Sequence, residues 1–117
     1  MTDSATSTTG KIVWFELPAG DSERARSFYG QLFGWQYEQF GDQDYHTSMD
    51  AGGAIFGAPE QTGPVVYFGV DDLDEAIARV GELGGAGGEK QEIPGVGYFA
   101  HCTDTEGNPI GLYQGAE

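Results

Sequence analysis

Few side chains of this sequence can act as a nucleophile or a base near neutral pH. His46 and His101 are its two imidazoles, and Cys102 is its one thiol. A thiol beside an imidazole can form a nucleophile and base pair. His101 and Cys102 are neighbours on an expected strand, however, and successive strand residues point to opposite faces. We therefore expect Cys102 to be a buried strand residue. Each histidine is a candidate for ligand binding, although a partly buried, hydrogen-bonded structural imidazole is favoured.

One carboxylate lies between aromatic residues in a pattern that suits ligand binding. Residues 12–17 are mostly β-branched or aromatic, which is typical of a strand. Strand alternation places Trp14 and Glu16 on the same face. An indole can stack on a planar ligand, and a carboxylate can accept a hydrogen bond or attract a cation. Glu16 is also the candidate general base of this sequence.

A second run, residues 65–70, resembles the first and presents Tyr67 in the position of Trp14. Two aromatic side chains and one carboxylate can thus line a common binding surface. The alternative is that Trp14 and Tyr67 simply fill space inside the fold. The sequence leaves both interpretations open.

These two strands belong to an internal repeat. A shift of 53 residues lays Val13 on Val66 and Phe15 on Phe68, and it aligns an Ala-Arg pair in both halves. Such self-similarity indicates a duplicated structural unit. The two histidines do not correspond under this shift, so a symmetric two-histidine site is disfavoured.

Each half is predicted to form a strand, a helix and three further strands. The second helix should begin at Asp72 with Glu75 as its capping partner, and the glycines at 34 and 84–85 should end the two helices. An apolar stripe marks the first helix, consisting of Ala25, Phe28, Tyr29, Leu32 and Phe33. The later strands are expected at 35–40, 44–49 and 53–56, and at 86–93, 97–103 and 109–114. The sequence therefore predicts an α+β fold of two βαβββ modules, whose curved mixed sheets surround a shared cleft.

Composition narrows the class of protein. The 117 residues suit one domain, and five basic residues against nineteen acidic ones give a net charge of −14. This charge repels nucleic acid and anionic membrane surfaces, so neither is an expected partner. A lone cysteine and no secretory signal or membrane span indicate a cytoplasmic protein. We expect a disordered leader at 1–10 and one domain at 11–117, with modules at about 11–57 and 64–114 and a linker at 58–63.

Several segments together resemble the glyoxalase/bleomycin-resistance/dioxygenase superfamily, also called vicinal oxygen chelate proteins. The resemblance extends over residues 11–114. Its most specific parts are Phe28-Tyr29 with Leu32-Phe33-Gly34-Trp35, and the turn Asp104-Thr105-Glu106-Gly107-Asn108. The resemblance implies paired βαβββ modules and a binding cleft. It does not imply one activity, because members include isomerases, dioxygenases, epimerases, thiol transferases and antibiotic-binding proteins.

The enzymes of this superfamily hold a divalent metal, but the matching positions here carry no ligand. The early ligand positions of the two modules fall on Ile12 and Val65, and the late glutamate positions fall on Gly111 and near Ala58. None of these side chains has a nitrogen or oxygen donor. We therefore expect no metal and no other cofactor.

The favoured function is metal-independent binding or sequestration of a small molecule, planar or cationic, in a cleft lined by Trp14, Glu16, Tyr67, His46 and His101. One alternative is a glyoxalase-like lyase or isomerase, or a dioxygenase, with a metal relocated to Glu16 or a histidine. A second form of this enzyme alternative is a metal-free acid/base catalyst with Glu16 as its base. Another alternative is an interaction module, and the resemblance makes a homodimer an expected assembly.

Overall fold

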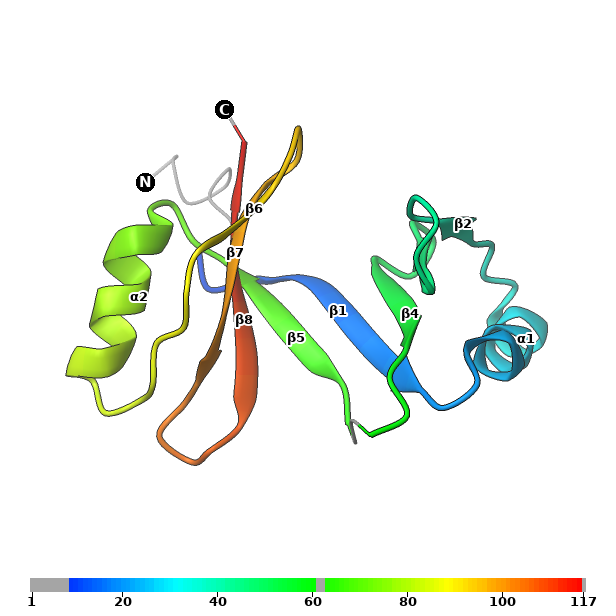
Figure 1. Ribbon diagram of the computed structural model, residues 1–117, viewed down its shortest axis with the longest axis horizontal. Helices are drawn as coiled ribbons and strands as arrows, with labels where there is room; N and C mark the ends of the chain where they lie inside the picture. The colour runs from blue at the N-terminus through cyan, green and yellow to red at the C-terminus, as the bar shows by residue number, and fades with distance from the viewer. Residues whose placement is uncertain (1–8, 61–62, 117) are drawn as a thin grey trace. The chain divides into compact units, whose positions relative to one another are not determined.

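The structure is a computed structural model that describes residues 9–60 and 63–116 (Figure 1). The chain divides into two compact units, Trp14–Val65 and Met1–Val13 with Val66–Glu117. We call the Trp14–Val65 unit module 1 and the other unit module 2. Each has the predicted order of strand, helix and three strands. The α+β fold class with two βαβββ modules is confirmed.

Module 1 builds its sheet in the order β2-β3-β4-β1. The strands are β1 (Ile12–Ala19), β2 (Glu38–Gln39), β3 (Tyr45–Ser48) and β4 (Gly53–Gly57). β1 and β4 run parallel, whereas β3 is antiparallel to both β2 and β4. The parallel pair is joined through α1 (Ser22–Phe33), as a crossover connection requires.

Local sequence sets both ends of α1. The Asp21 carboxylate accepts a hydrogen bond from the Arg24 backbone N–H at 3.0 Å, which caps the first turn. Gly34 ends the helix with φ of 80°, a left-handed conformation that glycine adopts without a Cβ penalty. The predicted stop at Gly34 is confirmed.

The apolar stripe of α1 is only partly buried. Phe28, Leu32 and Phe33 each remain 58–59% exposed. The ring of Tyr29 instead stacks on Trp35, with centroids 5.2 Å apart, and Phe33 lies beside both rings. This aromatic cluster follows the helix end, and β2 begins only at residue 38 rather than at the predicted 35.

Module 2 has the strand order β5-β8-β7-β6. Its strands are β5 (Val65–Gly69), β6 (Gln91–Ile93), β7 (Gly97–Thr103) and β8 (Pro109–Gly115), and its helix is α2 (Leu73–Glu82). β5 and β8 are parallel, and β7 is antiparallel to β6 and β8. α2 lies along these strands (Figure 1) and covers a core of Leu73, Ala100, Cys102 and Leu112. Cys102 is 6% exposed, so its predicted burial is confirmed.

Both ends of α2 lie where the sequence predicts them. Asp72 accepts a hydrogen bond from the Glu75 backbone N–H at 3.0 Å, as expected. The last helical residue is Glu82, and the predicted glycines end the helix: Gly84 has φ of 102°, and the Gly85 backbone N–H donates to the Val80 carbonyl at 2.9 Å. The predicted strand at 86–93 is present only as the three residues of β6 and an isolated antiparallel bridge between Ala86 and Thr103.

The predicted leader at 1–10 and the predicted linker at 58–63 lie partly outside the described residues. Of the predicted leader at 1–10, Thr9 bridges to Gly69 and the Gly10 backbone N–H donates to the Gly69 carbonyl at 2.9 Å. Residues 1–8, and residues 61–62 of the predicted linker, lie outside the described residues. Neither described helix has the length and apolar character of a membrane span.

Candidate functional site

The sheet of module 1 has two different faces. On one face, Phe15 contacts Trp35 at 6.2 Å between ring centroids, and Trp35 in turn stacks on Tyr29 of α1. This is therefore the face that α1 covers. Strand alternation turns Trp14 and Glu16 to the opposite face.

A chain of two hydrogen bonds connects three side chains on that opposite face. The indole N–H of Trp14 donates to the phenol oxygen of Tyr45 at 2.9 Å. The Tyr45 hydroxyl donates to Oε2 of Glu16 at 2.7 Å. The structure thus brings together Trp14 and Glu16, which were both predicted as site residues, through a third residue.

Sequence reasoning missed Tyr45. Its partner in the 53-residue repeat is Tyr98, but the two tyrosines have different roles. Tyr98 packs against the core beneath α2, whereas Tyr45 lies on the face away from α1. The repeat therefore carried no usable signal, and only the strand register reveals the contact.

The environment of Tyr45 keeps its hydroxyl protonated. Burial raises the pKa of Tyr45 far above its ordinary value of 10.0, and the negative charge of Glu16 raises it further. The hydrogen bond from Trp14 opposes this effect only in part. Because the indole N–H can only donate, the Tyr45 oxygen accepts from Trp14 and its hydrogen is directed to Glu16.

Further rings surround Tyr45 on the same face. The register pairs Tyr45 with Phe56, whose ring centroid lies 6.0 Å away, and Phe40 contacts Tyr45 edge to face at 6.1 Å. We call this set the ring face; it consists of Trp14, Glu16, Phe40, Tyr45 and Phe56. All five side chains are half-buried or exposed. The ring face can stack on an apolar ring and can accept hydrogen bonds or positive charge at Glu16.

In module 2, two other predicted site residues, Tyr67 and His101, lie in contact with each other. The Tyr67 hydroxyl and Nε2 of His101 are 2.7 Å apart, and the ring of Phe99 contacts both of these rings. Tyr67 is 5% exposed, whereas His101 is exposed. Cys102 lies in the core under α2 and points away from His101, which agrees with the predicted alternation.

The Tyr67 ring occupies the space that a side chain at position 111 would need. A Cβ built on Gly111 would lie 2.1 Å from Cδ2 of Tyr67. A glutamate, the ligand type that the resemblance assigns to this position, does not fit beside this ring. Over residues 9–60 and 63–116, no group of three or more His, Cys, Asp or Glu side chains could hold a metal ion. The residues present do not fit the metal centre that the fold family implies.

His46 lies apart from Trp14 and Glu16, on the face of module 1 that α1 covers. Its Nε2 is 3.1 Å from Oδ1 of Asp44, and the same oxygen accepts a 2.5 Å hydrogen bond from Ser22 at the start of α1. The Ser22 hydrogen bond is the main cause of a lowered Asp44 pKa; some desolvation of Asp44 opposes it, and the His46 hydrogen bond adds to it. His46 is 9% exposed, and this arrangement suits a structural role in holding α1 to β3.

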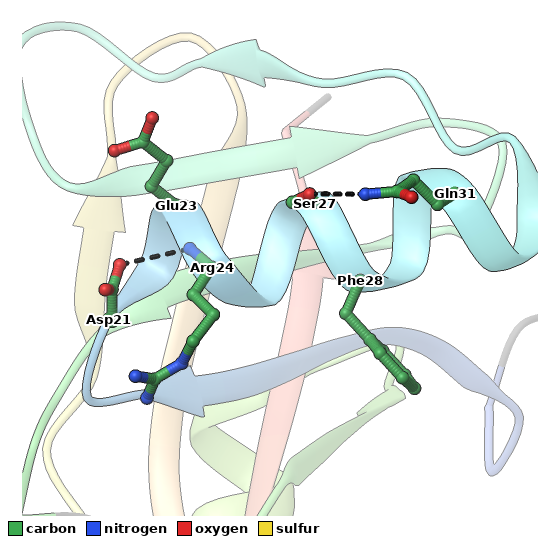
Figure 2. A pocket seen from close by; sticks show the side chains of 6 residues that line it. All are labelled: Asp21, Glu23, Arg24, Ser27, Phe28 and Gln31. Atoms are coloured by element: carbon green, nitrogen blue, oxygen red, sulfur yellow. Dashed lines mark hydrogen bonds between the residues drawn. The ribbon is translucent and has the colours of Figure 1, made fainter.

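A separate groove follows the outer surface of α1 (Figure 2). It is lined by Asp21, Glu23, Arg24, Ser27, Phe28 and Gln31. Asp21 caps the helix, and the Gln31 amide donates to the Ser27 hydroxyl at 2.8 Å. Because the cap and one helix supply every lining residue, the groove offers no second wall to enclose a ligand. It contains none of the predicted site residues.

Comparisons with known proteins find related sequences. A family model described as "Bleomycin resistance protein-like N-terminal" matches residues 11–46. CFP32 of Mycobacterium tuberculosis, a protein named as a glyoxylase, is 31% identical over 115 residues, which cover 86% of this chain and 44% of that protein. This chain thus spans less than half of that relative. A "Glyoxylase-like domain-containing protein" of Didymella fabae is 32% identical, and the match covers 85% of this chain and 89% of that protein.

Solved structures share the fold at lower identity. A glyoxalase/bleomycin resistance protein/dioxygenase superfamily member from Vibrio splendidus has a TM-score of 0.67 at 18% identity, covering 91% of this chain and 99% of that one. Methylmalonyl-CoA epimerase from Mycobacterium tuberculosis has a TM-score of 0.63 at 17% identity, covering 96% and 92%. An extradiol ring-cleaving dioxygenase from B. fuscum has a TM-score of 0.71 at 20% identity, covering 95% and 34%.

Proposed function

Because this chain belongs to the glyoxalase/bleomycin resistance/dioxygenase superfamily, we propose that it binds and sequesters a small molecule without a metal ion. The observation that carries the proposal is the hydrogen-bonded chain from Trp14 through Tyr45 to Glu16. It holds an aromatic surface and a carboxylate in one fixed arrangement, which is what recognition of a partly aromatic ligand requires.

The lack of donor atoms at the expected metal-ligand positions favours a function that needs no metal. The resemblance assigns three ligand positions of the superfamily to Ile12, Val65 and Gly111, and none of these side chains has a donor atom. At Gly111 the neighbouring Tyr67 ring also excludes a glutamate side chain. Catalysis by the metal-dependent route of the related enzymes would need ligands from other positions.

A metal-free acid/base enzyme is the second candidate. The 2.7 Å hydrogen bond from Tyr45 to Glu16 places a proton donor beside a carboxylate, and such a pair can move protons in catalysis. Epimerases and dioxygenases share the fold, but at 17–20% identity this likeness bears on the fold alone. Turnover of a bound ligand would distinguish this candidate from sequestration.

The first experiment measures metal and ligand binding on the same preparation. The chain is purified without chelators or a histidine tag, its metal content is measured, and its melting temperature is recorded with Mn²⁺, Fe²⁺, Ni²⁺ and Zn²⁺ and with a library of small molecules. We expect less than stoichiometric metal, no stabilisation by any ion, and stabilisation by at least one organic compound according to RT ln(1 + [L]/Kd).

A matched pair of variants locates the binding. Trp14→Ala removes a ring from the ring face, whereas Phe28→Ala removes an exposed ring from α1 on the other side of module 1. Trp14→Ala should abolish the ligand-induced shift and Phe28→Ala should preserve it. Stoichiometric metal, or one ion that stabilises the chain in a dose-dependent way, would overturn the proposal; so would a library without a single hit.

A further inference from the structure

The two helices are attached to their sheets by different kinds of contact. α2 packs four apolar side chains in or against the core of module 2, namely Leu73, Ala76, Ile77 and Val80. Within α1, all of whose residues the structure describes, Ser22 is the one buried side chain. Phe28, Leu32 and Phe33 of α1 are 58–59% exposed. Burial of apolar surface therefore stabilises the attachment of α1 less than that of α2.

The side of α1 that faces the sheet is polar or small. Ser22, Arg26 and Gly30 follow one another at steps of four residues and therefore share one side of the helix. The Ser22 hydroxyl donates to the Asp44 carboxylate, and a Cβ at Gly30 would lie 3.9 Å from Cε2 of Tyr37. This side of α1 thus lies against the segments around β2 and β3.

Three buried polar atoms of this region have no hydrogen-bond partner within the described part of the chain: Arg26 Nε, the Tyr37 hydroxyl oxygen and Ser48 Oγ. Ser48 is 2% exposed and lies on the same side of β3 as His46, which is the side toward α1. Continuing the antiparallel register of β2 and β3 by one residue places Tyr37 beside Ser48. Burial raises the pKa of Tyr37, and the nearby charge of Arg26 opposes this effect.

We propose that α1 is a hinged element, which opens away from β2 and β3 while the sheet of module 1 and the whole of module 2 stay folded. The hydrogen bond from Ser22 to Asp44 is the latch that holds it closed. Opening would bring water to Arg26, Tyr37 and Ser48, and a buried polar group without a partner recovers its desolvation cost when it is hydrated.

The architecture of module 1 permits such an opening. The strands β1 and β4, which α1 connects, pair directly with each other, so their hydrogen bonds do not depend on the helix. The ring of Trp35, on which Tyr29 stacks, follows α1 by two residues and can move with it. Elements that bury few apolar contacts open locally at a lower free energy than the core. The inference goes beyond the proposed function, because it concerns the face of module 1 opposite the ring face.

The test is native-state hydrogen exchange of the unliganded full chain, followed for each amide by NMR. It compares the hydrogen-bonded amides of residues 26–33 in α1 with those of residues 77–82 in α2. After correction for intrinsic rates, we expect the α1 amides to exchange about 100-fold or more faster. Urea below the unfolding transition should hardly accelerate exchange in α1, since opening exposes little new surface, but it should accelerate exchange in α2.

A matched pair of substitutions tests the polar contacts. Ser22 and Ser48 are both buried, but the Ser22 hydroxyl has a partner and Ser48 Oγ has none. Ser22→Ala removes the latch and should speed exchange of residues 26–33 about fivefold, whereas Ser48→Ala removes an unpaired hydroxyl and should slow it about fivefold. Exchange of residues 77–82 should stay within about twofold in both variants, because α2 belongs to the other module.

Three results would overturn the inference. Equal protection of the two helices would show that α1 does not open separately. Effects of the same sign for the two serine variants would show that the polar contacts do not control the opening. Protection of residues 26–33 that rises with protein concentration would show that a second copy covers the exposed side chains of α1 and holds the helix in place.

Discussion

Substitution of Gly111 should reveal how completely Tyr67 occupies the position that the family resemblance assigns to a metal ligand. A Cβ at residue 111 would lie 2.1, 2.4 and 2.6 Å from three atoms of the Tyr67 ring, including Cγ at its base. Contacts below 3.0 Å force neighbouring atoms to move, and a nearly buried ring whose base is in contact cannot simply swing away. Overpacking of this kind costs about 1–3 kcal/mol. Because Tyr67 also holds His101, we expect Gly111→Ala to cost about 2–3 kcal/mol.

A double-mutant cycle in denaturant unfolding isolates this cost. In a Tyr67→Ala background the ring is absent, and Gly111→Ala should then be neutral or stabilise by a few tenths of a kcal/mol. The coupling energy between the two positions should therefore be about 2–3 kcal/mol. Gly115 lies on the same strand, and its nearest neighbour would be 3.8 Å from a new Cβ. Gly115→Ala is the matched control and should change stability by less than about 0.5 kcal/mol.

The outcome has a direct bearing on the metal question. If Gly111→Ala cost no more than Gly115→Ala, the Tyr67 ring would not fill this position and the steric argument would be wrong. If Gly111→Glu folded normally and bound Zn²⁺ or Mn²⁺, the position would be open to a ligand after all. Either result would require a new account of why residue 111 is glycine.

Four further predictions follow from the packing and charges of the two modules. The raised pKa of Tyr45 contributes stability to the fold below a pH of about 10, and this contribution is lost as the pH rises further. Tyr45→Phe should therefore flatten the fall in unfolding free energy at alkaline pH. The lowered pKa of Asp44 contributes stability to the fold above the ordinary pKa of 3.8, and this contribution is lost at more acid pH. Ser22→Ala removes the main cause of the lowered pKa, so acid unfolding should move to higher pH when it is followed by circular dichroism. Leu73→Ala, at a fully buried position, should cost about 2–5 kcal/mol in urea unfolding. Gly81→Ala, inside α2 with no atom near a new Cβ, should raise stability by about 0.5–1 kcal/mol; a loss would show an unrecognised contact there.

Elements defined by local chemistry were predictable from residue types. Asp72 caps α2 through Glu75, and Gly34 ends α1, because both effects act within one helical turn. β7 also occupies the predicted 97–103. The lengths of β2 and β6 were overestimated, because a strand extends only as far as its partner pairs with it. β2 pairs with β3 over Glu38–Gln39, and β6 pairs with β7 over Gln91–Ile93. Residue types alone do not set where such pairing stops.

The candidate site also combines features that the sequence alone predicts with features that only the tertiary structure shows. By itself, the sequence determined that Trp14 and Glu16 share a strand face, since alternation is a local property. It also determined that Ile12, Val65 and Gly111, to which the resemblance assigns ligand positions, have no donor side chains. Only the tertiary structure decided that Tyr45 connects Trp14 to Glu16 and that His46 belongs to the α1 side. The reason is register: a shift of one residue in β3 would exchange the faces of Tyr45 and His46, and pairing across strands, not the identity of either residue, sets that register.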